Sequence, residues 1–61
     1  MDETPEKNFS IKENNGVWSV IENGEFYGDF RQEGDAISAV SSAISKAMPV
    51  RYSLNMNYKN D

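Results

Sequence analysis

Two short turns containing glycine determine the layout of the first half of this chain. Asn14-Asn15-Gly16 and Asn23-Gly24 lie on either side of an apolar run centred on Trp18. Asn-Gly is the preferred pair in two-residue hairpin turns, because both positions take a positive φ. The turns therefore predict a three-stranded antiparallel meander, with strands at residues 9–13, 17–22 and 25–30.

The second half of the chain shows two further periodicities. Apolar residues recur at helical spacing from Ile37 to Met48, with Asp35 as the expected N-cap and Pro49 as the stop. Strict alternation over residues 50–58 then predicts a final strand. The expected fold is a single α+β domain over residues 9–61, with element order β-β-β-α-β, one helix packed on one face of the sheet, and a disordered N-terminal tail over residues 1–8.

The register of the first hairpin decides which side chains lie beneath the helix. A three-residue loop ending at Gly16 gathers six large apolar side chains on one face of the sheet. A two-residue loop, Asn15-Gly16, moves Phe9 and Ile11 to the side of Trp18, because side chains alternate along a strand. We expect the three-residue loop, since one helix then covers all six. They are Phe9, Ile11, Val17, Ile21, Phe26 and Phe30.

The neighbour of the final strand is open to two solutions. It joins the sheet beside the first strand, in the order 3-2-1-4, or beside the third strand by a right-handed crossover. Either position donates its apolar side chains to the core. We favour the first strand as neighbour, which leaves the third strand at an edge.

The expected register leaves three apolar residues on the face without a helix: Trp18, Val20 and Tyr27. A contiguous exposed apolar cluster marks an interaction surface more often than isolated residues do. The alternative is ordinary cross-strand packing, with the methylenes of Lys12 lying over the indole. The sequence predicts an interface at Trp18, Val20 and Tyr27.

Composition opposes several classes of function. The chain contains no histidine and no cysteine, which removes the commonest general base, nucleophile and transition-metal ligands. Glu22 and Glu25 flank a turn, where carboxylates are solvated, and no calcium loop is present. We therefore expect no enzymatic activity, no catalytic residue, no metal and no cofactor.

Charge and hydropathy bear on partners and location. The formal net charge is −4, with 10 acidic and 6 basic residues, and this balance disfavours nucleic acids and anionic membranes as partners. No apolar run has membrane-spanning length, and the N-terminus shows no signal-peptide pattern. A cytoplasmic location is expected.

A longer segment resembles a group of small uncharacterised bacterial and phage proteins. It runs from Phe9 through the Trp18 hairpin to Asn23-Gly24, and continues after the next strand with Asp35-Ala-Ile-Ser-Ala-Val. Those proteins have a Trp-bearing hairpin followed by an Ala-rich helix, and the resemblance covers residues 9–47. It implies a compact α+β fold that often self-associates, and it implies no activity and no functional residue.

These observations predict a small non-enzymatic protein-interaction module that forms a homodimer through a sheet face or edge. The alternative is an acidic inhibitor of phage or plasmid type, which binds a basic host protein surface. A nucleic-acid binder is a third possibility, and it requires Arg51 and Lys59 to align with Trp18 and Tyr27 on one face.

Overall fold

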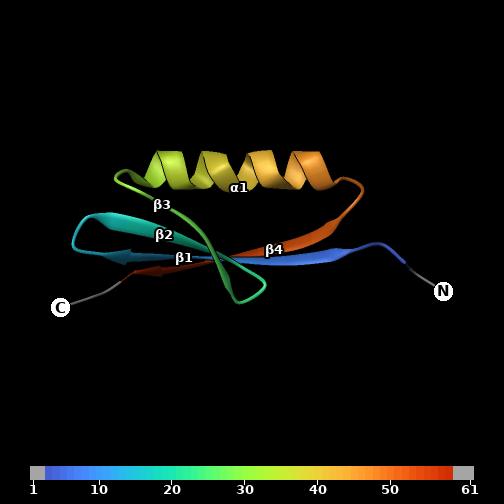
Figure 1. Cartoon of the computed structure of the whole chain (residues 1–61), viewed down its shortest axis with the longest axis horizontal. Coiled ribbons are helices and arrows are strands. Elements are labelled where there is room, and N and C mark those ends of the chain that lie inside the picture. Colours follow the sequence, from blue (N-terminus) through green and yellow to red (C-terminus); the bar gives the residue numbers. More distant parts are fainter. Residues whose placement is uncertain (1–2, 59–61) are drawn as a thin grey trace.

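The protein forms a four-stranded mixed sheet with one helix lying on one face, as a computed structural model shows for residues 3–58 (Figure 1). The strand order is β3-β2-β1-β4; β4 runs parallel to β1 and the other pairs are antiparallel. The α+β class, the order of elements and the place of the final strand are confirmed. The elements are β1 (Glu6–Asn14), β2 (Val17–Glu22), β3 (Glu25–Phe30), α1 (Glu33–Ala47) and β4 (Arg51–Tyr58).

The first hairpin has a two-residue loop, so the expected three-residue loop is wrong. Asn14 pairs with Val17, and Asn15 and Gly16 have φ values of 55° and 80°. Asparagine tolerates the left-handed region, so both loop positions accept the tight turn that matches the twist of the strands. As a result Ile11 pairs with Val20, and the side of β1 that carries Ile11 lies on the same face as Trp18.

The left-handed conformation of Gly16 leads to a stability prediction. Its φ is +80°, and the expected effect of Gly16→Ala is a loss of about 1–2 kcal/mol of unfolding free energy, because a Cβ is strained in this region. Urea titration measures the change. Gly34→Ala is the matched control: Gly34 lies in α1 with open space around it, and alanine there is expected to stabilise by up to about 1 kcal/mol. Equal losses for both variants would contradict the turn assignment.

A β-bulge in β3 changes the face of every later residue in that strand. Ile21 pairs with Phe26, but Val20 pairs with Gly28, so Tyr27 is an extra residue on the β3 side. Such a bulge inserts one residue and restarts the alternation. Phe30 consequently pairs with Trp18, so the expectation that Phe30 and Val17 share a face is wrong.

The core lies between α1 and the face of the sheet that carries Trp18. Phe9 and Val20 are fully buried there, and Ala36 and Val40 of α1 cover them. Of the six apolar residues expected under the helix, Phe9 and Ile11 are buried and Phe30 is half-buried against the core. The side chain of Val20 points inward, and side chains alternate between the two faces along a strand. The opposite face therefore carries Val17, Ile21 and Phe26.

The sheet begins earlier than the apolar pattern indicates. β1 starts at Glu6, whereas residues 1–8 were expected to form a disordered tail; Met1 and Asp2 lie outside the described residues. Arg51 donates its backbone N–H to the carbonyl of Pro5 (2.9 Å). Asn8 accepts a hydrogen bond from the N–H of Asn23 (2.8 Å) and donates its own N–H to the Asn23 side chain (2.8 Å). Polar residues can therefore extend the strand, because two neighbours supply partners for the backbone.

The helix also begins before the expected N-cap. Gln32 is the N-cap and contributes no side-chain hydrogen bond, so Asp35 lies inside the first turn rather than before it. Glu33 and Asp35 both occupy that turn, where carboxylates interact favourably with the helix dipole. The N–H of Ala36 bonds to the Gln32 carbonyl at 3.2 Å. Met48 has extended geometry at the other end, as expected for a residue before proline.

Candidate protein-interaction site

The three residues predicted to form an interface lie on the helix-covered face, not on the open one. Val20 is fully buried in the core, and Trp18 is half-buried against it. Tyr27 is 45% exposed, and its ring meets Phe9 edge-on with centroids 6.5 Å apart. They do not form an exposed cluster, because the two-residue loop and the bulge reverse the expected faces.

A different apolar surface is exposed along one side of α1. It is a groove of about 360 Å³ between α1 and β4, which we call the α1–β4 groove. Four of its side chains are well exposed, with exposed fractions of 62% for Met48, 57% for Tyr52, 39% for Ile37 and 37% for Leu54. The groove is lined by Ile37, Val40, Ser41, Ile44, Ser45, Met48, Tyr52 and Leu54.

The groove exists because α1 packs mainly over β1, β2 and β3, away from β4. Small residues face the sheet: Ala36 is buried, and Ala43 packs against the core beside Val40. These positions follow helical spacing, so one narrow stripe meets the sheet. The larger Ile37 and Met48 lie beside that stripe, with β4 below them. The predicted apolar stripe therefore points partly into the core and partly into the groove.

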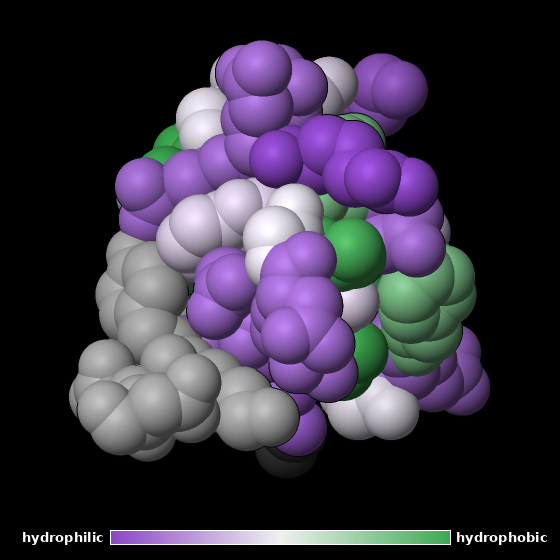
Figure 2. All heavy atoms as spheres, turned by 90° about the vertical axis from the view of Figure 1, so that its left-hand side faces the viewer, coloured by the Kyte–Doolittle hydropathy of each residue, from purple (hydrophilic) through white to green (hydrophobic). Residues whose placement is uncertain are grey.

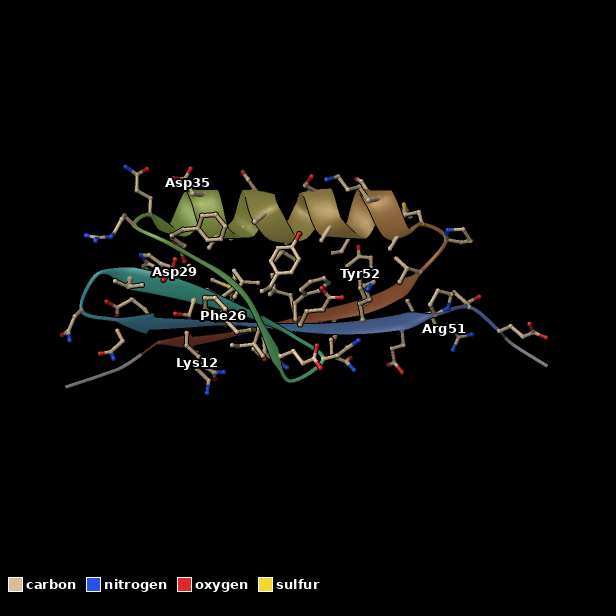
Figure 3. The ribbon with its side chains drawn as sticks, viewed as in Figure 1. Lys12, Phe26, Asp29, Asp35, Arg51 and Tyr52 are labelled. Atoms are coloured by element: carbon tan, nitrogen blue, oxygen red, sulfur yellow. The ribbon has the colours of Figure 1, made fainter. Side chains whose placement is uncertain are left out.

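The side chains of β4 reach the groove from the sheet. Register places Tyr52 beside Lys7 and Leu54 beside Phe9, so both share the helix-covered face. Figure 3 shows Tyr52 between β4 and α1, whereas Lys12 points away from the helix. The expectation that β4 donates its alternate side chains to the core is correct for Met56, which packs against it, and not for Tyr52 or Leu54.

The chemistry of the groove is that of apolar contact. Its polar groups are the hydroxyls of Ser41, Ser45 and Tyr52, and no charged residue lines it. The nearest charge on that face of β1 is Lys7, which forms an ion pair with Glu22. Within residues 3–58 no group of three or more acidic, histidine or cysteine residues is placed to hold a metal ion. The groove suits apolar side chains or methylenes, with hydroxyls to orient a polar group.

The backbone of β4 provides hydrogen-bonding groups next to the groove. Because the N–H of Arg51 points to β1, alternation along the strand turns the N–H and C=O groups of Tyr52, Leu54 and Met56 toward the outer edge. In the described sheet no strand pairs with that edge. The residues whose backbone faces outward are thus the same residues whose side chains face the helix.

The opposite face of the sheet is mainly polar. Ser53 donates a hydrogen bond to the Asn8 side chain there (2.8 Å), and Phe26, 66% exposed, lies across from Ile21. Arg51 is also on this face, because it pairs with Glu6. Trp18 and Tyr27 lie on the other face, and Lys59 lies outside the described residues. Arg51 therefore does not share a face with Trp18 and Tyr27, as the predicted nucleic-acid surface required.

One end of the molecule shows little apolar surface. Figure 2 views the end that carries the start of α1 and the β1–β2 turn, and this surface is largely hydrophilic with small apolar areas. No helix in the described part of the chain is both long and apolar enough to cross a bilayer.

No family model, no curated protein and no solved structure matches this chain. The resemblance to small bacterial and phage proteins therefore stays a prediction.

Proposed function

We propose that this protein is a non-enzymatic protein-interaction module that binds an extended polypeptide segment along the outer edge of β4. The segment adds a strand to the sheet, and its alternate side chains enter the α1–β4 groove. The observation that carries this proposal is the coincidence of the two features: outward backbone groups at Tyr52, Leu54 and Met56 lie directly beside exposed apolar side chains. Strand addition uses backbone hydrogen bonds for affinity and side-chain pockets for specificity.

The size of the apolar surface supports a binding role of moderate strength. Ile37, Met48, Tyr52 and Leu54 together expose on the order of 300–400 Å², given about 150–250 Å² for a large side chain. At about 25 cal/mol per Å², burying this area stabilises a complex by about 8–10 kcal/mol before association costs of about 4–15 kcal/mol. We expect dissociation constants in the micromolar range or weaker.

A cytoplasmic location stays a prediction.

The experiment is selection of peptides from a randomised displayed library against the immobilised protein. We expect extended peptides with alternating apolar residues, and binding that persists in high salt because the groove carries no charge. Changes in the NMR spectrum should map to β4 and to the groove side of α1. Binding that salt abolishes would instead support the acidic inhibitor as the function.

Two substitutions test whether the peptides use this site. Ile37→Asp places a carboxylate in the groove at an exposed position, and it is expected to weaken peptide binding at least about tenfold. Ser38→Asp is the control, because Ser38 is exposed and does not line the groove. Failure to select any peptide when the protein is immobilised sparsely enough to remain monomeric, or equal binding by the two variants, would overturn the proposed function.

A further inference from the structure

We infer that the segment bound at the β4 edge is β4 of a second copy of this chain, paired antiparallel across a twofold axis with Leu54 at its centre. This inference rests on the proposed use of the β4 edge and names its partner. The pairing joins two four-stranded sheets into one sheet of eight strands, with both helices on the same side.

The two edges of the sheet differ in how readily they pair. The β3 edge is interrupted by the bulge at Tyr27 and carries Glu25 and Asp29, and both bulges and charges on edge strands hinder pairing. The β4 edge has no bulge in its described register and no acidic residue within Arg51–Tyr58. An unprotected edge of this length pairs with another strand when one is available.

A twofold axis at Leu54 satisfies the outward backbone groups of both copies. An axis perpendicular to the sheet makes the two strands antiparallel and keeps each residue on its own face. Leu54 then lies opposite Leu54 of the second copy, and Tyr52 lies opposite Met56. These are the residues whose N–H and C=O groups point outward, so each pair exchanges two hydrogen bonds. The thioether of Met56 also contacts the Tyr52 ring, a favourable sulfur–aromatic pair.

Charge permits this pairing although each chain has a formal charge of −4. The register places Arg51 opposite Asn57, so the one charged residue of β4 does not meet its own counterpart. No charged residue lines the groove. Two acidic chains can therefore approach along β4 without opposing like charges at the interface.

The twofold axis covers both grooves at once. Each copy contributes on the order of 300–400 Å² of exposed apolar side chain from the same four groove residues, at about 150–250 Å² for a large side chain. Two copies and their backbone edges approach the lower end of about 1,200–2,000 Å² that specific interfaces bury. A partner that supplies only a strand covers one groove, whereas a second copy places its own groove next to the first.

Sedimentation velocity of the 61-residue chain from about 1 µM to 1 mM tests the inference. We expect a monomer–dimer equilibrium with a micromolar dissociation constant. Leu54→Lys places two ammonium groups beside the axis and is expected to weaken association at least about tenfold, with the circular dichroism spectrum retained. Asn55→Lys adds the same charge at the next residue on the opposite face and is expected to leave association within about threefold.

Hydrogen exchange reports which backbone groups form the interface. The amides of Tyr52, Leu54 and Met56 are expected to exchange at least about tenfold more slowly at 1 mM than at 1 µM, whereas those of Ser53 and Asn55, which face β1, are protected at both concentrations. Chemical synthesis with N-methyl-Leu54 removes one outward donor without changing the side chain, and it should abolish association.

The possible outcomes separate this inference from the proposed function. A monomer at 1 mM overturns the twofold pairing. So does a dimer in which the outward amides exchange at the same rate at 1 µM and at 1 mM. If the monomer still binds selected peptides and Ile37→Asp weakens that binding, the proposed function stands with a different partner. If neither peptides nor a second copy binds, both are wrong.

Discussion

Replacing Phe9 with alanine is expected to remove a large part of the free energy of unfolding of this protein at 25 °C. Phe9 is fully buried between the sheet and α1, next to Val20 and Val40. Truncating a buried phenylalanine costs about 3–5 kcal/mol, through lost burial and the cavity left behind. A chain of 61 residues has about 3–9 kcal/mol of total stability at the usual value per residue. Urea titration followed by fluorescence of Trp18, the one tryptophan, measures the loss.

Phe26→Ala is the matched control for this experiment. The same atoms are removed, but Phe26 is 66% exposed on the face without the helix. The expected loss is within about 1 kcal/mol, since little buried surface disappears. If Phe26→Ala destabilises as much as Phe9→Ala, the faces are those of the three-residue loop and the core described above is wrong.

Inserting one alanine between Gly28 and Asp29 is expected to be nearly as damaging as Phe9→Ala. The bulge at Tyr27 currently places Phe30 under the helix beside Trp18. One further residue reverses that placement, so Asp29 turns toward the core and Phe30 toward solvent. Losing the burial of an aromatic ring and burying a carboxylate together cost about 3–5 kcal/mol. Urea titration against the parent chain gives this difference.

Deleting Tyr27 is the companion variant, and a smaller effect is expected from it. Phe26 then precedes Gly28 directly, so the pairs Ile21–Phe26 and Val20–Gly28 both survive without a bulge. The main loss is the edge-on contact between Tyr27 and Phe9, worth about 0.5–1.5 kcal/mol. If the deletion destabilises the protein as much as the insertion does, the assignment of Tyr27 as the extra residue in the pairing of β3 with β2 is wrong.

Local signals were sufficient to predict the elements of this fold. Asn23-Gly24 takes a two-residue turn with φ values of 51° and 84°, as its sequence indicates. Pro49 follows the end of α1, and alternation after it predicts β4 within one residue of its observed start. These features depend on backbone preferences of a few neighbouring residues, so they can be recognised without knowledge of the packing.

The faces of the sheet could not be predicted in the same way. β2 carries apolar residues on both sides, so Val20 and Ile21 are each plausible core residues. The choice depends on one residue in the first loop, because Asn14-Asn15-Gly16 is compatible with either loop length. Gly28 within a strand is a recognised sign of a bulge. A bulge at this point puts Phe30 on the same face of the sheet as Trp18.

The α1–β4 groove was missed because it depends on where α1 lies over the sheet. The sequence shows that Ile37, Val40 and Met48 share a helical stripe, and it does not show that only Val40 is fully buried. The alanines at 36 and 43 are the available signal: small residues spaced along one side let α1 approach the sheet closely there. The larger residues are then displaced toward β4.

The central position of β1 has a consequence for synthesis on the ribosome. Its partner on one side is β2, which follows within a few residues, but its partner on the other side is β4, with Ser53 bonded to Asn8 at a separation of 45 positions. The hairpins can close as soon as they leave the exit tunnel, whereas the second flank of β1 stays bare until β4 has also emerged. During that interval the nascent chain exposes a middle strand to its neighbours, and fast local closure followed by a slow last docking step is the kinetic pattern that this connectivity imposes.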